Sequence, residues 1–239
     1  MAKKYKNTVH KNPFRENRPK KNIPWKLICV ISGFLALILI TTLVLNALFG
    51  TRKLRITSDG GFYDKRSGIT YQMAPLCYQP VEIIKRKNNP DKDVYAKYND
   101  TKFYKVKDIS AEKIITTAYD GIYEIYYNEE HPLPTLFDMN VKLAWICEAE
   151  VSVVGVEMID ETEAKALVSM LADASLYCDM PTNIDAESTK YLYFTGTEHP
   201  YLYYYVQYFN TADGVSYVCD SANTGRCVPI GDLLKEIIG

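Results

Sequence analysis

LICVISGFLALILITTLVLNALF, residues 27–49, is an apolar run of 23 residues without Asp, Glu, Lys or Arg. As an α-helix it would be roughly 35 Å long, because each residue adds about 1.5 Å. A helix needs about 20 apolar residues to cross a bilayer, whereas the apolar region of a signal peptide typically has about 7–15. The run therefore predicts one transmembrane helix over residues 27–49.

The end of the run favours a helix that is retained rather than cleaved. A signal-peptidase site needs small residues at two nearby positions, and here Leu48 or Phe49 fills one of them. The alternative of a buried helix in a soluble domain is disfavoured by the length of the run and by the charged residues before it. We therefore expect a signal-anchor.

The charges before and after the run have opposite signs. Nine of the 28 Lys and Arg residues but one of the 29 Asp and Glu residues precede Leu27, so residues 1–26 carry about +8 and the rest about −9. Because basic flanks tend to remain in the cytoplasm, we expect a cytoplasmic N-terminus and an extracytoplasmic C-terminal domain. The reverse orientation stays open, because residues 10–26 hold six basic residues and residues 51–67 hold five.

Residues 1–26 lack an apolar pattern, which predicts a disordered basic tail. Its Lys and Arg side chains can attract anionic lipid head groups, so the membrane is an expected partner. Nucleic acid is not an expected partner, because such a tail offers no surface for reading bases.

Runs rich in Val, Ile, Tyr and Phe recur after the apolar segment, as half-buried antiparallel strands require. One helix is expected over residues 160–174, where Asp160 can cap it and Glu163 completes a capping box. These patterns predict an α+β fold with a mainly antiparallel sheet and a few helices, one of them short and C-terminal. The expected strands cover residues 69–73, 93–98, 102–106, 121–127, 142–147, 150–159, 189–195, 201–209, 214–219 and 226–229.

The chain is thus expected to have four parts. A tail (1–26) and a transmembrane helix (27–49) precede a juxtamembrane approach with the first strands (50–92) and an extracytoplasmic α+β domain (93–239). Two packed lobes, about 93–159 and 160–239, are an open alternative for the last part.

Five cysteines follow the apolar run, and none belongs to a C-x-x-C pair. This argues against a zinc ribbon and against a thioredoxin-like redox motif. A hairpin centred on Asn223 would place Cys219 opposite Cys227, within reach of a disulfide. Cys219 and Cys227 are therefore a candidate disulfide, with two buried thiols as the alternative.

Two short segments carry a resemblance to other proteins. Asp64–Tyr71 (DKRSGITY) and Leu133–Leu136 (LPTL) resemble segments of uncharacterised single-pass, membrane-anchored extracytoplasmic proteins of Gram-positive anaerobic bacteria. The resemblance covers scattered pieces of the domain and includes no motif of known activity. It implies a bacterial cell-envelope protein and transfers no functional residue.

The sequence offers no catalytic, cofactor or metal motif. It has no G-x-S-x-G elbow, Walker loop, dinucleotide fingerprint or EF-hand. His131 and His199 each lie in a Glu-His-Pro tripeptide, and two imidazoles with two carboxylates could hold a metal. Neighbours in an extended loop point in different directions, however, so we expect polar loop residues. An envelope hydrolase that uses His131 or His199 is the alternative.

PYLYYYVQYFN, residues 200–210, is the candidate binding surface. As a strand it places Tyr201, Tyr203 and Tyr205 on one face. If exposed, such a row could bind an envelope protein, a peptide or a wall polymer; alternatively, a loop or a helix covers it. The sequence therefore predicts a membrane-tethered extracytoplasmic binding module without catalytic activity. A subunit of a transmembrane signalling complex is a further alternative.

Overall fold

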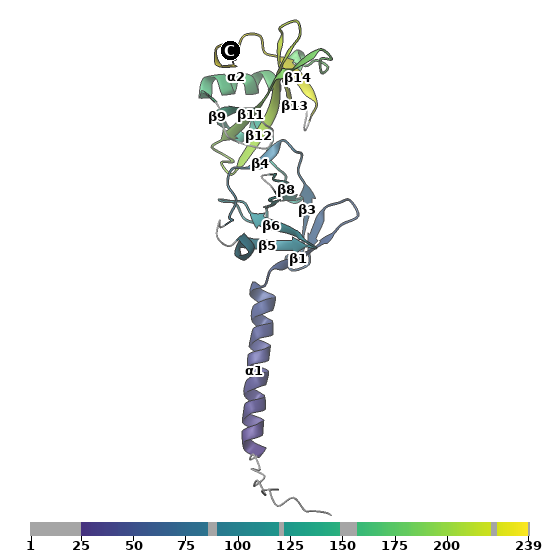
Figure 1. Cartoon of the computed structure of the whole chain (residues 1–239), viewed down its shortest axis with the longest axis vertical. Coiled ribbons are helices and arrows are strands. Elements are labelled where there is room, and N and C mark those ends of the chain that lie inside the picture. The colour runs from purple at the N-terminus through teal and green to yellow at the C-terminus, as the bar shows by residue number, and fades with distance from the viewer. Residues whose placement is uncertain (1–24, 86–89, 120–121, 149–156, 221–223, 239) are drawn as a thin grey trace, which may run out of the picture. The chain divides into compact units, whose positions relative to one another are not determined.

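The computed structural model describes residues 25–85, 90–119, 122–148, 157–220 and 224–238 (Figure 1). It divides into two compact units, Met1–Gly50 and Thr51–Gly239. Most of the expected tail, residues 1–24, and most of the strand expected at 150–159 lie outside the described residues.

The first unit contains helix α1, Trp25–Phe49. None of the window Cys29–Asn46 is buried, and this window is long and apolar enough to cross a membrane. The hydroxyls of Thr41 and Thr42 each donate a hydrogen bond of 2.8 Å to the carbonyl four residues earlier. The helix therefore satisfies these two polar side chains internally.

The second unit begins with a closed barrel in the strand order β1-β2-β3-β8-β7-β6-β5. Neighbouring described strands are antiparallel except where parallel pairing of β1 with β5 closes the barrel. The strands are β1 Arg52–Ile56, β2 Phe62–Asp64, β3 Ile69–Met73, β5 Val94–Tyr98, β6 Thr101–Lys105, β7 Ile114–Thr117 and β8 Ile125–Asn128. A 3₁₀ helix, η1 Pro90–Asp93, precedes β5.

Aromatic side chains make up much of the barrel core. The ring centroid of Phe62 lies 4.9 Å from that of Phe103, 5.1 Å from that of Tyr126 and 5.3 Å from that of Tyr98. Tyr71 is fully buried, and its hydroxyl donates to the carbonyl of Ala111 at 2.8 Å. Burial of the Tyr71 ring is thus compatible with its polar end, because its hydroxyl has a partner.

The DKRSGITY segment forms the turn between β2 and β3. Asp64 is 1% exposed and accepts hydrogen bonds from Arg52 Nη1 at 2.6 Å, Ser67 Oγ at 2.8 Å and the Arg66 N–H at 2.9 Å. Gly68 has φ +75°, a left-handed conformation that favours glycine. These residues of the segment therefore have a structural role in the barrel.

The second sheet has the order β10-β9-β11-β12-β13-β14, and β4 pairs with part of β12. Its strands are β4 Tyr78–Pro80, β9 Val141–Cys147, β10 Glu157–Ile159, β11 Ile184–Gly196, β12 Leu202–Thr211, β13 Ser216–Asp220 and β14 Arg226–Pro229. All described pairs in this sheet are antiparallel.

Helix α2, Glu161–Ala172, packs against this sheet through Ala164, Leu167 and Leu171 (Figure 1). The Asp160 side chain caps it by accepting from the N–H groups of Thr162 and Glu163 at 2.7 and 2.9 Å. This helix confirms the capped amphipathic segment expected from the sequence. The remaining helices are η2 Leu136–Met139, η3 Ala174–Leu176 and α3 Lys235–Ile238.

The observed fold is mostly β with few helices, as the sequence predicts. Of the strand expected at 121–127, residue 121 lies outside the described residues and β8 covers Ile125–Asn128. Just before β8, the Glu124 carbonyl accepts a hydrogen bond of 3.0 Å from the N–H of Thr117. The last strand of the barrel ends at Asn128. The strands of the second sheet begin at Val141, except for β4, which lies earlier in the chain and pairs with β12. The change of sheet therefore does not coincide with the lobe boundary considered near residue 159.

Candidate functional site

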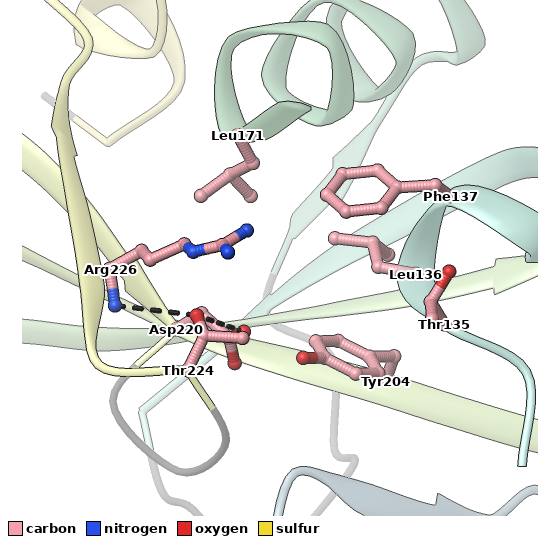
Figure 2. Close-up of a pocket in the computed structure, with 8 residues that line it drawn as sticks. All are labelled: Thr135, Leu136, Phe137, Leu171, Tyr204, Asp220, Thr224 and Arg226. Carbon is pink, nitrogen blue, oxygen red and sulfur yellow. Dashed lines mark hydrogen bonds between the residues drawn. The ribbon is translucent and has the colours of Figure 1, made fainter. Parts of the chain in front are cut away.

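A pocket of about 150 Å³ lies beside the C-terminal end of α2 (Figure 2). Four separate parts of the second unit build it: the start of η2, the last turn of α2, β12, and the β13–β14 hairpin. Its lining residues are Thr135, Leu136, Phe137, Leu171, Tyr204, Asp220, Thr224 and Arg226.

Asp220 supplies the buried charge of this pocket. Its residue surface is 8% exposed, and its Oδ2 accepts a hydrogen bond from Thr224 Oγ1 at 2.8 Å. Its Oδ1 is buried without a hydrogen-bond partner among the described residues. Burial raises the pKa of Asp220, although hydrogen bonding to Thr224 and Tyr204 partly opposes the shift. Asp220 is therefore a buried acceptor at the wall of the pocket, and one of its oxygens has no hydrogen-bond partner among the described residues.

Arg226 supplies the positive charge at the pocket. It lies directly opposite Asp220 in the β13–β14 ladder. Its Nη1 donates to the hydroxyl of Tyr177 at 3.1 Å, and its guanidinium carbon lies 4.8 Å from the centre of that ring. The Tyr177 hydroxyl in turn donates to the Leu171 carbonyl at 2.8 Å. Tyr177 thereby holds Arg226 toward α2.

The other walls are mainly apolar. Leu136 and Leu171 are both buried, whereas Phe137 is 48% exposed at the edge of the pocket. Tyr204 packs edge-to-face on Tyr78 with ring centroids 5.0 Å apart. The arrangement combines an apolar wall with one acceptor and one cation, which is the usual character of a small-molecule site.

The start of η2 is fixed by hydrogen bonds between Thr135 and Asp138. The backbone N–H and the hydroxyl of Thr135 both donate to Asp138 Oδ2, at 2.9 and 2.7 Å. The hydroxyl of Tyr78 also donates to the Pro134 carbonyl at 2.8 Å. These bonds hold Leu136 and Phe137 at the pocket.

The candidate disulfide pair lies next to the two charged residues. Cys219 and Cys227 are joined in the structure, are cross-strand partners and have Cα atoms 4.1 Å apart. Each cysteine is a sequence neighbour of Asp220 or Arg226. The bridge therefore holds the register that places these two charged residues opposite each other.

The tyrosine row expected as a binding face is partly covered. Tyr205 is 2% exposed, and its ring centroid lies 5.2 Å from that of the fully buried Tyr193. Tyr201 and Tyr203 are half-buried, and Tyr203 packs edge-to-face on Trp145 at 5.5 Å. The three tyrosines do not form a continuous exposed surface, whereas the pocket opens on the opposite side of β12.

The two histidines lie in loops outside this pocket. His131 is exposed, and His199 Nδ1 lies 2.8 Å from the Tyr201 hydroxyl. Within the described ranges, no group of three or more His, Cys, Asp and Glu residues is placed to hold a metal.

A larger and more open groove of about 750 Å³ lies on the barrel, with Lys102 and Glu124 among its lining. Lys102 Nζ is paired with Asp91 Oδ1 at 2.7 Å. Among the described side chains, only Tyr95 Oη and Asp220 Oδ1 are buried without a hydrogen-bond partner. The groove therefore lacks the buried acceptor that distinguishes the pocket.

Family models, curated proteins and solved structures give no significant match to this chain. The candidate site accordingly depends on the geometry of this chain alone. The sequence did contain a signal for this site. In the expected hairpin, Asp220 follows Cys219 and Arg226 precedes Cys227, so opposite charges lie next to the two cysteines on the side of the turn. The apolar wall had no comparable signal, because its residues come from distant segments.

Proposed function

We propose that this protein is a membrane-anchored module whose β-rich domain lies outside the cytoplasm and binds a small ligand in the pocket around Asp220. The observation that carries the binding function is the buried Asp220 carboxylate, one oxygen of which has no described partner inside a cavity. A buried acceptor without a partner costs about 1–3 kcal/mol, and a ligand donor would remove this cost.

The exposed apolar surface of α1 supports the anchoring. Fifteen of residues 27–49 are Leu, Ile, Val or Phe. At about −0.3 kcal/mol for each, their insertion would contribute roughly −4.5 kcal/mol. A bilayer is the environment that would cover such a helix along its whole length.

Charge and cysteine chemistry support the extracytoplasmic placement of the domain. The basic residues before α1 favour a cytoplasmic N-terminus, as described above. The Cys219–Cys227 bridge suits an oxidising compartment, because cytosolic thiols are kept reduced. The modest volume of the pocket suits a small molecule better than an extended polymer.

Cys178 allows the orientation to be measured. Among the described free cysteines of the β-rich unit, Cys178 is exposed, while Cys77 and Cys147 are buried. Partial burial and the neighbouring Asp179 raise the pKa of Cys178, so its reactive thiolate is scarce at neutral pH and the labelling is carried out at mildly alkaline pH. Intact bacterial cells expressing the full chain should therefore react there with a membrane-impermeant maleimide.

The Cys178→Ser variant is the matched control for this experiment. We expect labelling of the parent protein in intact cells and a loss of most of the label in the variant. Labelling of Cys178 only after permeabilisation would place the domain in the cytoplasm and contradict the proposal.

A further inference from the structure

The two charges of the pocket lie opposite each other but are not paired with each other. Side chains directly opposite in an antiparallel ladder have Cβ atoms about 4.5–5.5 Å apart, close enough for an ion pair between long side chains. Asp220 and Arg226 occupy such positions, yet no ion pair joins these two described residues.

Different neighbours hold the two charged groups. Thr224 Oγ1 donates a hydrogen bond to one oxygen of Asp220. The Tyr177 hydroxyl accepts a hydrogen bond from the guanidinium of Arg226, which also lies over the Tyr177 ring. Figure 2 shows both side chains at the same cavity, between Leu171 and Tyr204. The cavity thus presents an acceptor and a cation side by side.

A ligand with a single charge would match only half of this arrangement. An amine would satisfy Asp220 but meet the positive charge of Arg226, and a carboxylate would pair with Arg226 but meet the negative charge of Asp220. A ligand with an ammonium and a carboxylate on the same carbon can satisfy both. Its ammonium would donate to the Asp220 carboxylate and its carboxylate would accept from Arg226.

The third substituent of such a ligand would face the apolar wall. Leu136, Phe137 and Leu171 offer carbon surface without a polar side-chain atom. A cavity of about 150 Å³ has room for an aliphatic side chain of moderate size but little room for an indole.

We infer that the pocket binds a free α-amino acid with an aliphatic side chain such as that of leucine. This inference rests on the proposed function, because it names the ligand class for the same site. No covalent chemistry is involved, since the ligand is held by charge, hydrogen bonds and apolar burial.

Calorimetric titration of the full chain in detergent micelles tests the inference with three probes. L-Leucine carries both charged groups, 3-methylbutylamine lacks the carboxylate, and 4-methylpentanoate lacks the ammonium. We expect L-leucine to bind at least tenfold more tightly than either analogue. Because all three probes are applied to the unaltered chain, this comparison does not depend on whether a variant folds.

Two substitutions assign each charged group of leucine to its partner. Asp220→Asn should weaken L-leucine at least tenfold while leaving 4-methylpentanoate binding no weaker, and Arg226→Gln should weaken L-leucine while sparing 3-methylbutylamine. Asp232→Asn, at an exposed carboxylate outside the pocket, is the control and should change none of the three affinities.

The outcomes separate this inference from the proposed function. If an analogue binds at the Asp220 pocket but L-leucine does not bind more tightly, the pocket is a ligand site and the amino-acid inference is overturned. If none of the three probes binds, the amino-acid inference is again overturned. The proposed orientation is tested separately by the Cys178 labelling and fails only there.

Discussion

Asp220 and Arg226 are cross-strand partners whose charged groups are bonded to different neighbours, Thr224 and Tyr177. Without these two neighbours, a direct ion pair would be the simplest way to satisfy both charges. The arrangement leaves an acceptor and a cation at one pocket without an ion pair between them. It also identifies Tyr177, which does not line the pocket, as a residue that positions Arg226.

Tyr177→Phe should release Arg226 from its hydroxyl partner. Arg226 can then approach Asp220, so we expect L-leucine affinity to fall about three- to tenfold and the pKa of Asp220 to decrease. Calorimetry measures the affinity, and NMR titration of the carboxyl carbon measures the pKa. Tyr119→Phe, at a side chain that is 75% exposed, is the control. Unchanged affinity in Tyr177→Phe would contradict the positioning role.

Asp220→Asn should make the ligand-free protein more stable at neutral pH. The pKa of Asp220 is raised in the folded state, so folding favours its protonated form. The resulting stabilisation is complete below the unfolded pKa of about 3.9 and is lost as the pH rises through the folded pKa. The neutral Asn avoids this loss, and we expect a gain on the order of 1 kcal/mol at pH 7.

Thermal unfolding of Asp220→Asn and of the parent protein at pH 3.5 and pH 7 measures this difference. The gain should shrink at the lower pH, where Asp220 is protonated in both folded and unfolded states. A gain of equal size at both values would show that charge is not its cause.

Removal of the Cys219–Cys227 bridge should weaken both stability and binding. The two cysteines are eight positions apart, and closing a loop of this size stabilises a fold by roughly 2–3 kcal/mol. Cys219→Ala with Cys227→Ala should therefore lower the free energy of unfolding in urea by about that amount. Affinity for L-leucine should also fall, because the register of Asp220 and Arg226 loses its covalent restraint.

The exposed Cys178→Ser substitution is the matched control for the loss of the bridge. We expect it to change the free energy of unfolding by less than about 0.5 kcal/mol, since it replaces one weak thiol donor at the surface with a hydroxyl that can also donate. Equal effects of the two changes would argue against a stabilising role of the bridge.

Asp64→Asn should destabilise the barrel. Burial alone would raise the pKa of Asp64, but hydrogen bonds from Arg52, Ser67 and the Arg66 N–H outweigh burial and lower it. The stabilisation from this carboxylate is therefore present above the unfolded pKa of about 3.9 and is lost as the pH falls through the folded pKa. Because the Arg52 side chain is 22% exposed and solvent screens part of the pair, we expect the substitution to cost about 1–3 kcal/mol.

Urea unfolding at pH 7 and pH 2.5 tests the role of Asp64. The difference between Asp64→Asn and the parent protein should be large at pH 7 and small at pH 2.5. Glu82→Gln breaks an exposed pair with Lys107 and should cost no more than about 1 kcal/mol at either pH. A similar effect of both substitutions would contradict the role of burial.

Local patterns in the sequence were sufficient for several elements of the fold. Residues 69–73 form β3 with the expected bounds, and the Asp160 cap begins α2 where the sequence places it. In both cases the signal lies within a few residues. For β3 it consists of apolar and β-branched residues, and for α2 it is a capping side chain before an apolar face.

The closed barrel could not be predicted in the same way. β1 has the sequence RKLRI, in which only Leu54 is buried, so its alternation is hidden by charged residues. Its partner β5 begins about 40 positions later, and no local pattern encodes a parallel pairing over such a distance. β4 is a strand of three residues that ends in Pro80, and its pairing with β12 depends on tertiary structure.

The candidate site was predictable only in part. The hairpin centred on Asn223 already implies that Asp220 lies opposite Arg226. The sequence could not show that Asp220 would lie at a pocket, because Leu136 and Leu171, which line it too, lie on separate helices. The tyrosine row was visible in the sequence, but the burial of Tyr205 was not.

Only Gly50 and Thr51 separate α1 from β1 along the chain. Because β1 closes the barrel, it is hydrogen-bonded along both edges, to β2 and to β5. Tension transmitted through α1 would enter the fold at this strand and would have to break two ladders together, whereas an edge strand can peel away one bond at a time. Barrel closure would therefore make β1 more resistant to pulling through α1 than an edge strand in the same position.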